Sequence, residues 1–317
     1  MRIVDPAPRP LAEALGLAPA LLELAKRGDA AITASLVEGP AVVLGALQRA
    51  GRVVDLAACA TAGTTVLRRW TTGTAVYIGP HAILWTLALP HVAALQADAT
   101  PRTLLNRNVR GFLAGLSRGG APAQYFGREW IAIHHRPAAL LGFDALPDGR
   151  IVIEVFAGLD ATIALPPALC ADEERAVDRW RGKEPLAIAA DDPAGLARRV
   201  IEAVAARAGA RGDRAERTIE LQLESAAPIT DPRDPVPAGL ALAASTRAPI
   251  GWIDAAVATS RLWIGGDALA ASFAVRAIAD AIARGEAPAP GDAPIDGAAW
   301  GDLLDAGRAA LAGRAGA

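Results

Sequence analysis

The chain has 317 residues, a formal net charge of −2 at pH 7 and 52% hydrophobic residues. This length predicts one large or two moderate domains with enough residues to bury a core. The near-neutral charge gives no reason to expect nucleic acid as a partner. No uninterrupted apolar stretch is long enough to cross a membrane and no secretory signal opens the chain, so we expect a cytoplasmic protein without a membrane partner.

Cysteine and histidine are scarce. Cys59 and Cys170 are the only cysteines, which is too few for a disulfide framework or a zinc site of four cysteines. His134 and His135 have no cysteine or aspartate nearby, and on a strand at most one of them faces a site. We therefore expect no metal site, and we interpret both thiols as small buried apolar side chains.

Apolar spacing and turn signals predict the elements of the first part of the chain. In chain order we expect a helix over 11–26, strands over 31–38 and 41–44, a helix over 53–62, a strand ending at residue 67, a polar turn over 71–74, a strand restarting at residue 75 and a helix over 101–116. Pro19 either kinks the first helix or marks its start. Thr100 is expected to cap the last one.

The second part is read in the same way. After strand structure that includes residues 134–135, we expect a hairpin of buried strands over 149–157 and 161–165, a charged loop over 172–183, a helix over 193–208, an edge strand over 218–224, a strand over 251–264 and helices over 268–284 and 300–312. Two proline-rich stretches, 227–245 and 288–294, are interpreted as a linker and a loop.

Residues 66–89 place two arginines, a tight polar turn and a buried strand in immediate succession. A strand, turn and strand would aim Arg68, Arg69 and the backbone N–H groups of the turn at one place, which suits a phosphate or carboxylate. Because neighbouring strand residues point to opposite faces, we expect only one arginine in a pocket. The alternative is a pair of solvated arginines beside a threonine turn that is satisfied by its own backbone.

The run over 68–81, R-R-W-T-T-G-T-A-V-Y-I-G-P-H, resembles the pattern R-R-x-(S/T)-G-G-G-A-V-(Y/F)-H-x-x-G of the lipoate-protein ligase A family, within the biotin/lipoate ligase superfamily. Thr72 and Thr74 replace two of the three glycines, and Ile78 stands at the histidine. Threonine tolerates neither φ > 0 nor the close approach of a ligand well, so we expect a stiffer and bulkier loop. The resemblance implies a set of ligand-binding candidates: Arg68, Arg69, Thr71, Thr72, Gly73, Thr74, Ala75, Tyr77, Gly79, His81 and, from a second motif, Gly142.

That second motif resembles the family pattern G-R-(N/D)-D-(I/L), a strand and then K-(I/V)-x-G. Gly127, Arg128, Ile131 and Gly142 match it, and Ala139 stands where the family has its lysine. In the family this ammonium stabilises charge as an acyl-adenylate forms and reacts, an effect worth roughly 3 kcal/mol of barrier. Arg136, Arg128 and His135 are the candidates to replace it, although a guanidinium is not equivalent to an ammonium. A P-x-V-x-x-G-x-x-Q segment, Pro40 to Gln48, also resembles the start of lipoate ligases.

The resemblance implies an α+β fold: a biotin/lipoate ligase-like mixed β-sheet core flanked by helices over residues 1–226, a linker over 227–245, and a small α+β C-terminal domain over 246–317. It implies ATP and lipoate or octanoate as ligands if the protein is active, and a lipoyl- or acyl-carrier domain as a partner. The residues alone indicate no cofactor.

Three functions are open on the sequence. The first is a diverged pseudoenzyme that binds an acyl, lipoyl or nucleotide ligand or a carrier domain without forming an acyl-adenylate. The second is an active lipoate-protein ligase, or a lipoyl or octanoyl transferase, with a rearranged site. The third is a structural subunit in which the pocket beside Gly73 is filled.

Overall fold

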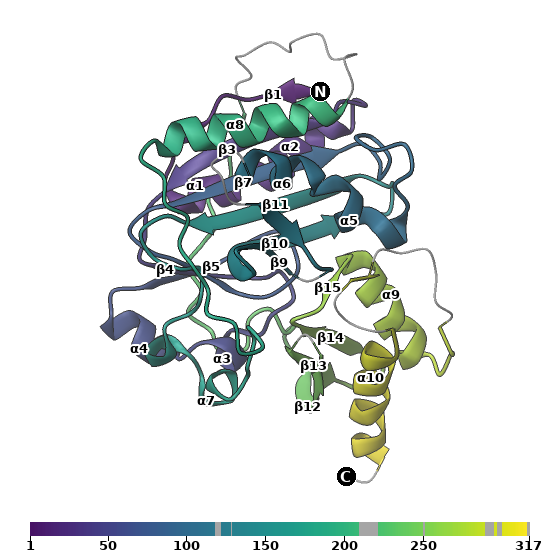
Figure 1. Ribbon diagram of the computed structural model, residues 1–317. Coiled ribbons are helices and arrows are strands. Elements are labelled where there is room, and N and C mark those ends of the chain that lie inside the picture. The colour runs from purple at the N-terminus through teal and green to yellow at the C-terminus, as the bar shows by residue number, and fades with distance from the viewer. Residues whose placement is uncertain are drawn as a thin grey trace.

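The computed structural model describes residues 1–117, 122–127, 129–208, 221–249, 251–288, 295–296 and 300–315. Its centre is an eight-stranded mixed sheet in the order β1-β3-β7-β11-β10-β9-β8, with β2 paired to β3 (Figure 1). These strands are β1 (Arg2–Ile3), β2 (Ala7–Pro8), β3 (Ala31–Val37), β7 (Ala82–Leu89), β8 (Ala123–Tyr125), β9 (Trp130–Ile133), β10 (Arg136–Ala145) and β11 (Ile151–Gly158). Only β1 and β2 run parallel to their partner β3. The expected mixed sheet is confirmed.

Helices cover one face of this sheet. They are α5 (Leu104–Asn108), α6 (Arg110–Leu116) and α8 (Pro193–Ala205), with the short 3₁₀ segments Pro101–Thr103 and Ala206–Ala208 at their ends. Trp85 of β7 anchors this layer, since its indole N–H donates to the carbonyl oxygen of Ala197 in α8 at 3.3 Å. We call this side of the sheet the helix face.

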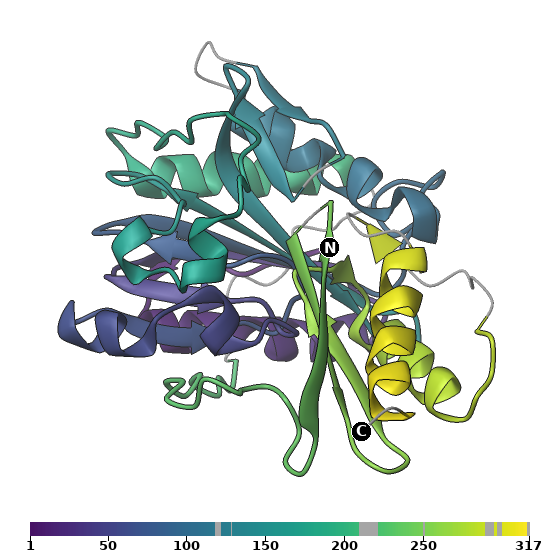
Figure 2. The same ribbon diagram turned by 90° about the horizontal axis from the view of Figure 1, so that it is seen from below.

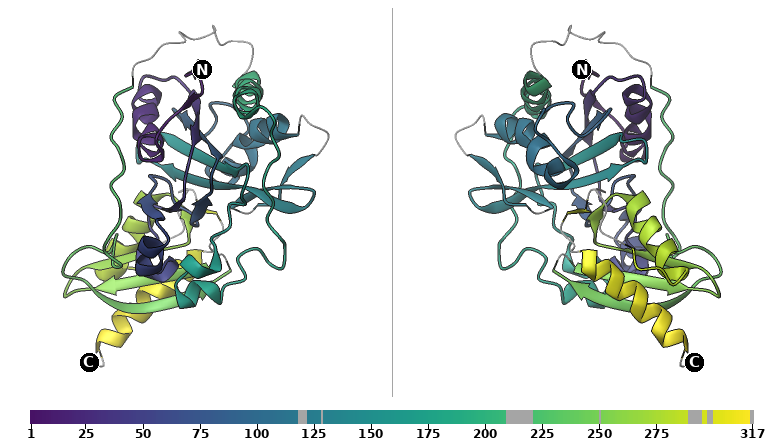
Figure 3. Two further views of the ribbon diagram at one scale, coloured as in Figure 1. Left: turned by 90° about the vertical axis from the view of Figure 1, so that its left-hand side faces the viewer. Right: turned by 90° about the vertical axis from the view of Figure 1, so that its right-hand side faces the viewer.

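Two structures share the opposite face (Figures 1 and 3). One is the helix pair α1 (Leu11–Leu15) and α2 (Leu17–Ala25); the other is a three-stranded sheet in the order β5-β4-β6, made of β4 (Ala41–Leu44), β5 (Thr65–Arg68) and β6 (Val76–Ile78). Apolar side chains of β4, β5 and β6 pack against Leu84, Leu140 and Phe156 of the large sheet. We call this side the buried-sheet face. Short helices α3 (Ala50–Val53), α4 (Leu56–Thr61) and α7 (Asp172–Arg175) and the 3₁₀ segment Pro167–Leu169 lie beyond the small sheet.

The C-terminal unit comprises the described residues from 241 onward (Figure 2). It holds the antiparallel strands β12 (Ala241–Ala248), β13 (Gly251–Val257) and β14 (Leu262–Gly266), the pair β15 (Leu269–Ala270) and β16 (Ile295–Asp296), and the helices α9 (Ser272–Ala283) and α10 (Trp300–Ala315). The N-terminus lies in the upper part of Figure 3, and the C-terminus lies at the far end of this unit. Within the described residues, no helix is both long and apolar enough to cross a membrane.

Several predicted helices are divided in the structure. The helix expected over 11–26 breaks at Gly16 rather than at Pro19, because Pro19 lies in the first turn of α2, where the missing N–H is tolerated. The helix expected over 53–62 is two helices, since Asp55 caps α4 by accepting from the N–H groups of Ala57 and Ala58. The helix expected over 101–116 is likewise divided into a 3₁₀ turn, α5 and α6.

Strand pairing also differs from the predictions. Residues 161–165 form no strand, and β11 pairs instead with β10 and β7. The single strand expected over 251–264 is the hairpin of β13 and β14. Residues 221–224 are not a strand, and 218–220 lie outside the described residues, as do 289–294 of the proline-rich loop. Strand β12 begins inside the stretch read as a linker, while α8, α9 and α10 confirm the predicted helices.

Candidate functional site

The motif turn, residues 69–75 between β5 and β6, wraps around the side chain of Arg69. The guanidinium Nη2 donates to the carbonyl oxygens of Thr72 at 3.1 Å and Thr74 at 2.8 Å, and the group lies over the ring of Phe156 at 5.4 Å. Only 1% of Arg69 is exposed. The turn therefore closes on a guanidinium of its own chain.

A row of four cross-strand neighbours, three of which have polar side chains, crosses the large sheet beneath this turn on the buried-sheet face. Gly142, Glu154, Thr86 and Thr33 are direct cross-strand neighbours in β10, β11, β7 and β3. The hydroxyl of Thr71 donates to the Glu154 carboxylate. We call these four residues the polar row.

Gly142 makes the contact between the turn and the row possible. A Cβ atom there would collide with the Thr71 hydroxyl and would lie 2.8 Å from Arg69 Nε and 2.9 Å from the Thr72 carbonyl oxygen. Real Cβ atoms do not approach other atoms so closely. The glycine that the second motif retains therefore provides the space in which Arg69 and Thr71 lie against the sheet.

The electrostatics of this cluster follow from its burial. Burial lowers the pKa of Arg69 to about 10, and the nearby Glu154 charge opposes that change. Burial raises the pKa of Glu154, opposed by its hydrogen bond from Thr71 and by the charge of Arg69. The buried atoms Arg69 Nε and Nη1, Glu154 Oε1, and the hydroxyls of Thr33, Thr74 and Thr86 have no hydrogen-bond partner among the described residues.

Threonine at the two altered glycine positions ties the turn to its surroundings. The Thr72 hydroxyl lies 2.8 Å from the carbonyl oxygens of both Phe143 and Ala270, to one of which it donates its single proton, and it accepts from the Ala270 N–H at 3.1 Å. In the motif turn only Gly73 has positive φ, at +102°. Threonine is therefore accommodated without strain at 72 and 74, and glycine persists where the backbone needs it.

Arg68 and Arg69 have different partners, but both line one cavity, so the expectation that only one of them lies in a pocket is wrong: β5 ends at Arg68, and strand alternation does not extend to Arg69. Arg68 donates to the carbonyl oxygens of Gly45 at 2.5 Å and Asp234 at 3.1 Å, and it lies 3.4 Å from the Asp234 carboxylate. Burial lowers the pKa of Arg68, and the charge of Asp234 opposes that change.

The position of the family lysine faces away from the motif turn. Ala139 is fully buried and is aligned with Ala157 and Ile83 on the helix face, whereas Gly142, three residues on, is on the buried-sheet face. No residue from 137 to 144 is basic, so a shift of the alignment within this strand would not supply a cation.

The other cation candidates lie elsewhere. Arg136 donates to the carbonyl oxygens of Glu184 and Pro185 at 2.9 and 3.0 Å. His134 and His135 are not on a strand: with φ of +51° and +59° they form the exposed two-residue turn between β9 and β10. Arg128 lies outside the described residues.

The remaining candidates are placed around β6. Ala75 is buried and Tyr77 is half-buried. Gly79 packs against Ala161. His81 is exposed and pairs with the carboxylate of Asp160. The ligand-binding role of all these residues stays a prediction. Within the described residues, no cluster of histidine, cysteine, aspartate and glutamate could hold a metal ion.

A second buried polar network was not anticipated from the sequence. Gln48 accepts from the Gly45 N–H at 2.8 Å and donates to Asp267 at 2.5 Å, and Asp267 also accepts from Arg179 at 3.4 Å. Arg179 in turn donates to Glu174 at 2.8 and 2.5 Å. This network joins the P-x-V-x-x-G-x-x-Q segment to the C-terminal unit. In the sequence, the glutamine of that segment was the one signal that could have indicated the network.

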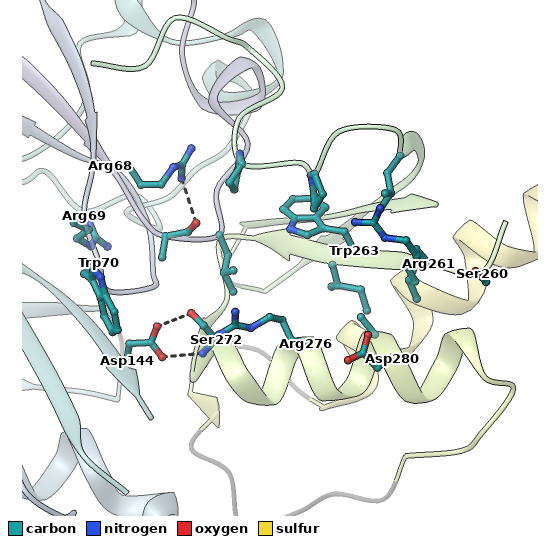
Figure 4. Close-up of a pocket in the computed structure, with 18 residues that line it drawn as sticks. Arg68, Arg69, Trp70, Asp144, Ser260, Arg261, Trp263, Ser272, Arg276 and Asp280 are labelled. Atoms are coloured by element: carbon teal, nitrogen blue, oxygen red, sulfur yellow. Dashed lines mark hydrogen bonds between the residues drawn. The ribbon is translucent and has the colours of Figure 1, made fainter. Parts of the chain in front are cut away.

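A cavity of about 590 Å³ lies between the large-sheet body and the C-terminal unit, and we call it the interface cavity (Figure 4). Its lining residues come from three regions: Ala46, Leu47, Arg68, Arg69, Trp70 and Asp144 from the body; Pro235, Pro237 and Leu240 from the connecting segment; and Ser260, Arg261, Leu262, Trp263, Ile264, Ser272, Arg276, Ala279 and Asp280 from the C-terminal unit. Of the ligand-binding candidates, only Arg68 and Arg69 are among them.

Comparison with solved structures defines the class of fold. P. falciparum LipL1 in complex with lipoate has a TM-score of 0.63 at 12% identity, covering 89% of this chain and 88% of its own. A bipartite lipoate protein ligase from Thermoplasma acidophilum, described with its E2 lipoyl domain, has a TM-score of 0.53 at 13% identity, covering 65% and 84%. A lipoate-protein ligase A bound with ATP has a TM-score of 0.52 at 15% identity, also covering 65% and 84%. The chain thus has the lipoate/biotin ligase-like α+β fold.

Sequence comparison adds a family match over part of the chain. Residues 10–136 match the model of the lipoyl protein ligase A/B catalytic domain. This match confirms the resemblance to the lipoate-protein ligase A family, within the biotin/lipoate ligase superfamily, that the motifs indicated. No curated protein matches the sequence.

Proposed function

We propose that this protein is a diverged lipoate-protein ligase-like protein that binds an acyl or nucleotide ligand, or a lipoyl carrier domain, without forming an acyl-adenylate itself. The observation that carries the proposal is the lysine position. Ala139 is buried on the helix face, and no basic residue lies anywhere between residues 137 and 144. The motif strand therefore offers no ammonium to a developing charge.

The state of the motif turn supports the same proposal. Arg69, the residue best placed to hold an anion, is bound by its own turn and lies beside Glu154 and Phe156. An anionic ligand at this guanidinium would have to enter a fully buried cluster and compete with the Glu154 carboxylate. A ligase that has to admit ATP and a carboxylate at this turn would need it open.

The decisive experiment measures adenylate formation. The full chain is incubated with ATP, Mg²⁺ and lipoate, octanoate or biotin, and pyrophosphate exchange is followed beside an active lipoate-protein ligase as the positive control. We expect no exchange above the protein-free blank. Loss of one preorganised charge lowers kcat by about 10²–10³-fold, so the assay must detect at least a thousandth of the control rate.

Transfer to a lipoyl domain is the second measurement, since a relative of this fold was described with such a domain. Mass spectrometry of the domain should find no acylation with free acid plus ATP. Adenylate formation or transfer would overturn the proposal in favour of an active ligase or transferase with a rearranged site. Arg69→Gln and Arg136→Gln would then identify the cation in use.

Installing a lysine at Ala139 is a poor rescue test. The side chain would place an ammonium in the apolar layer on the helix face of the sheet, which is costly without a partner. Leu140→Lys would project to the buried-sheet face instead, but Leu140 is fully buried in an apolar cluster, so its ammonium would meet the same cost.

A further inference from the structure

We propose that the interface cavity binds an amphipathic anion, a molecule with an apolar body and a single carboxylate or phosphate head, and that Arg261 and Arg276 hold the head. The inference deepens the proposed function, because it locates a binding site away from the closed motif turn. Both arginines come from the C-terminal unit, so the site exists only when that unit is docked.

The walls of the cavity are mainly apolar. Leu240, Leu262 and Ile264 line it, together with the indoles of Trp70 and Trp263. Trp70 is 40% exposed, which is unusual for so large an apolar side chain, and it faces the cavity from the body while Trp263 faces it from the C-terminal unit (Figure 4). A volume of about 590 Å³ is within the range of sites for small organic ligands.

Some charged side chains of the cavity already have hydrogen-bond or ion-pair partners, and others do not. Arg68 is paired with Asp234, and the Asp144 carboxylate accepts from the N–H and hydroxyl of Ser272. By contrast, no hydrogen bond or ion pair joins the side chain of Arg261 or Arg276 to another described residue, although the charge of Arg276 acts on Asp144 and the Asp280 carboxylate also lines the cavity. Figure 4 places Arg261 beside Trp263 and Arg276 on α9 near Ser272. These two guanidinium groups are therefore the exposed donors, whereas Arg69, which also lines the cavity, has unpartnered Nε and Nη1 atoms that are buried.

The character of the lining favours one head on an apolar body. The N-terminal N–H of α9, a common anion site, is already bound to Asp144 and so is not free for a phosphate. A nucleotide would need hydrogen-bond partners for a base and a ribose, yet besides the indole N–H groups of Trp70 and Trp263 the lining offers only the hydroxyls of Ser260 and Ser272, and Ser272 is engaged. An apolar body with one anionic head uses what remains: hydrophobic walls and two unpaired arginines.

The experiment titrates the full chain with sodium decanoate, decyl phosphate, the neutral analogue decanamide, and ATP, using isothermal titration calorimetry and tryptophan fluorescence. The variants are Arg276→Gln and Arg261→Gln. The matched control is Arg308→Gln, which removes the same charge from an exposed position on α10 outside the cavity. All three are surface changes, and equal melting temperatures will establish that each variant is folded.

We expect decanoate or decyl phosphate to bind the wild type, and each cavity variant to raise its Kd by about tenfold or more, the effect of losing one charge-assisted hydrogen bond. Arg308→Gln should leave Kd unchanged, and decanamide should bind the wild type at least about tenfold more weakly than decanoate. Whichever of the two anions binds identifies the head.

Four results would overturn the inference: no binding of either anion, equal binding to all variants, equal binding of decanamide and decanoate, or binding of ATP alone. Its failure is distinguishable from that of the proposed function, because adenylate formation is measured separately. Pyrophosphate exchange overturns the proposed function whatever the cavity binds, and absent binding of both anions without exchange overturns only the cavity inference.

Discussion

At the scale of single residues, hydrogen bonds within the chain hold the motif turn closed. Thr72 bonds to β10 and β15, and Arg69 is enclosed by carbonyl oxygens of its own turn. Glycine remains at position 73, where φ is positive, and at position 142, where the turn touches the sheet. Each glycine that persists is one that the geometry requires.

Gly142→Ala should therefore destabilise the protein. Its new methyl group would meet Thr71, the Arg69 guanidinium and a backbone carbonyl, and overpacking of this kind costs about 1–3 kcal/mol. The matched control is Gly301→Ala in α10, where a Cβ meets nothing within 4 Å and where alanine favours the helix by up to about 1 kcal/mol. Urea unfolding should move the midpoints in opposite directions. If both variants unfold like the wild type, the close approach at Gly142 is wrong.

At the scale of elements, side chains from distant strands hold the C-terminal helices in place. Asp144 at the end of β10 caps α9 by accepting from the N–H of Ser272 at 2.8 Å and from its hydroxyl at 2.5 Å. Burial raises the pKa of Asp144 to about 6, and these hydrogen bonds and the charge of Arg276 only partly oppose it. The cap therefore includes a carboxylate that is costly to ionise.

The pH dependence of stability should reveal this cost. The folded state keeps the Asp144 proton to about pH 6, whereas the unfolded chain releases it near 3.8. The stabilisation from Asp144 is thus fully present below pH 3.8 and is lost as pH rises through 6, a change of roughly 3 kcal/mol. Relative to the wild type, Asp144→Asn should gain about 2–3 kcal/mol of unfolding free energy between pH 4 and 7.5. A difference between Asp144→Asn and the wild type that does not change with pH would refute the assignment.

The sequence predicts elements well where the pattern is local. The periodic apolar face of α8 is visible in a few consecutive residues. Pairing is not local: residues 161–165 look like a hairpin partner of β11, yet β10 and β7 occupy both of its edges. Strand β12 has the composition of a linker, mostly alanine and polar residues, and only its pairing with β13 defines it.

Some features of the candidate site could likewise be predicted from local sequence, and others could not. The motif residues and the missing lysine could be found from the sequence, because they occupy fixed spacings in two short stretches. The polar row could not, since Thr33, Thr86 and Glu154 are far apart in the chain and become neighbours only through register. The interface cavity depends on Trp70 and Trp263 lining it from two distant parts of the chain, which no local pattern encodes.

At the scale of the whole molecule, the C-terminal unit is continuous with the body. One apolar cluster includes Phe143 of β10 together with Leu269 and Val275 of the unit. Buried polar contacts reinforce it: Gln48 with Asp267, and Arg49 with Asp254 at 3.1 Å. The two parts should therefore behave as one cooperative structure rather than as a core with an appendage.

Splitting the chain tests this continuity. A break after Pro237, in the turn that precedes β12, cuts no strand or helix and leaves the hydrogen bonds of Gly51 to Pro232 and of Ala50 to Asp234 within the first fragment. Fragment 1–237 alone should expose the apolar surface that Leu269 and Val275 cover, and should therefore bind a hydrophobic dye and aggregate. Co-expressed with 238–317, it should copurify as a one-to-one complex, because burial of that surface drives association without a peptide link. A first fragment that is monomeric, dye-negative and as heat-stable as the intact chain would mean that the unit is only tethered, and the interface cavity would then have no fixed second wall.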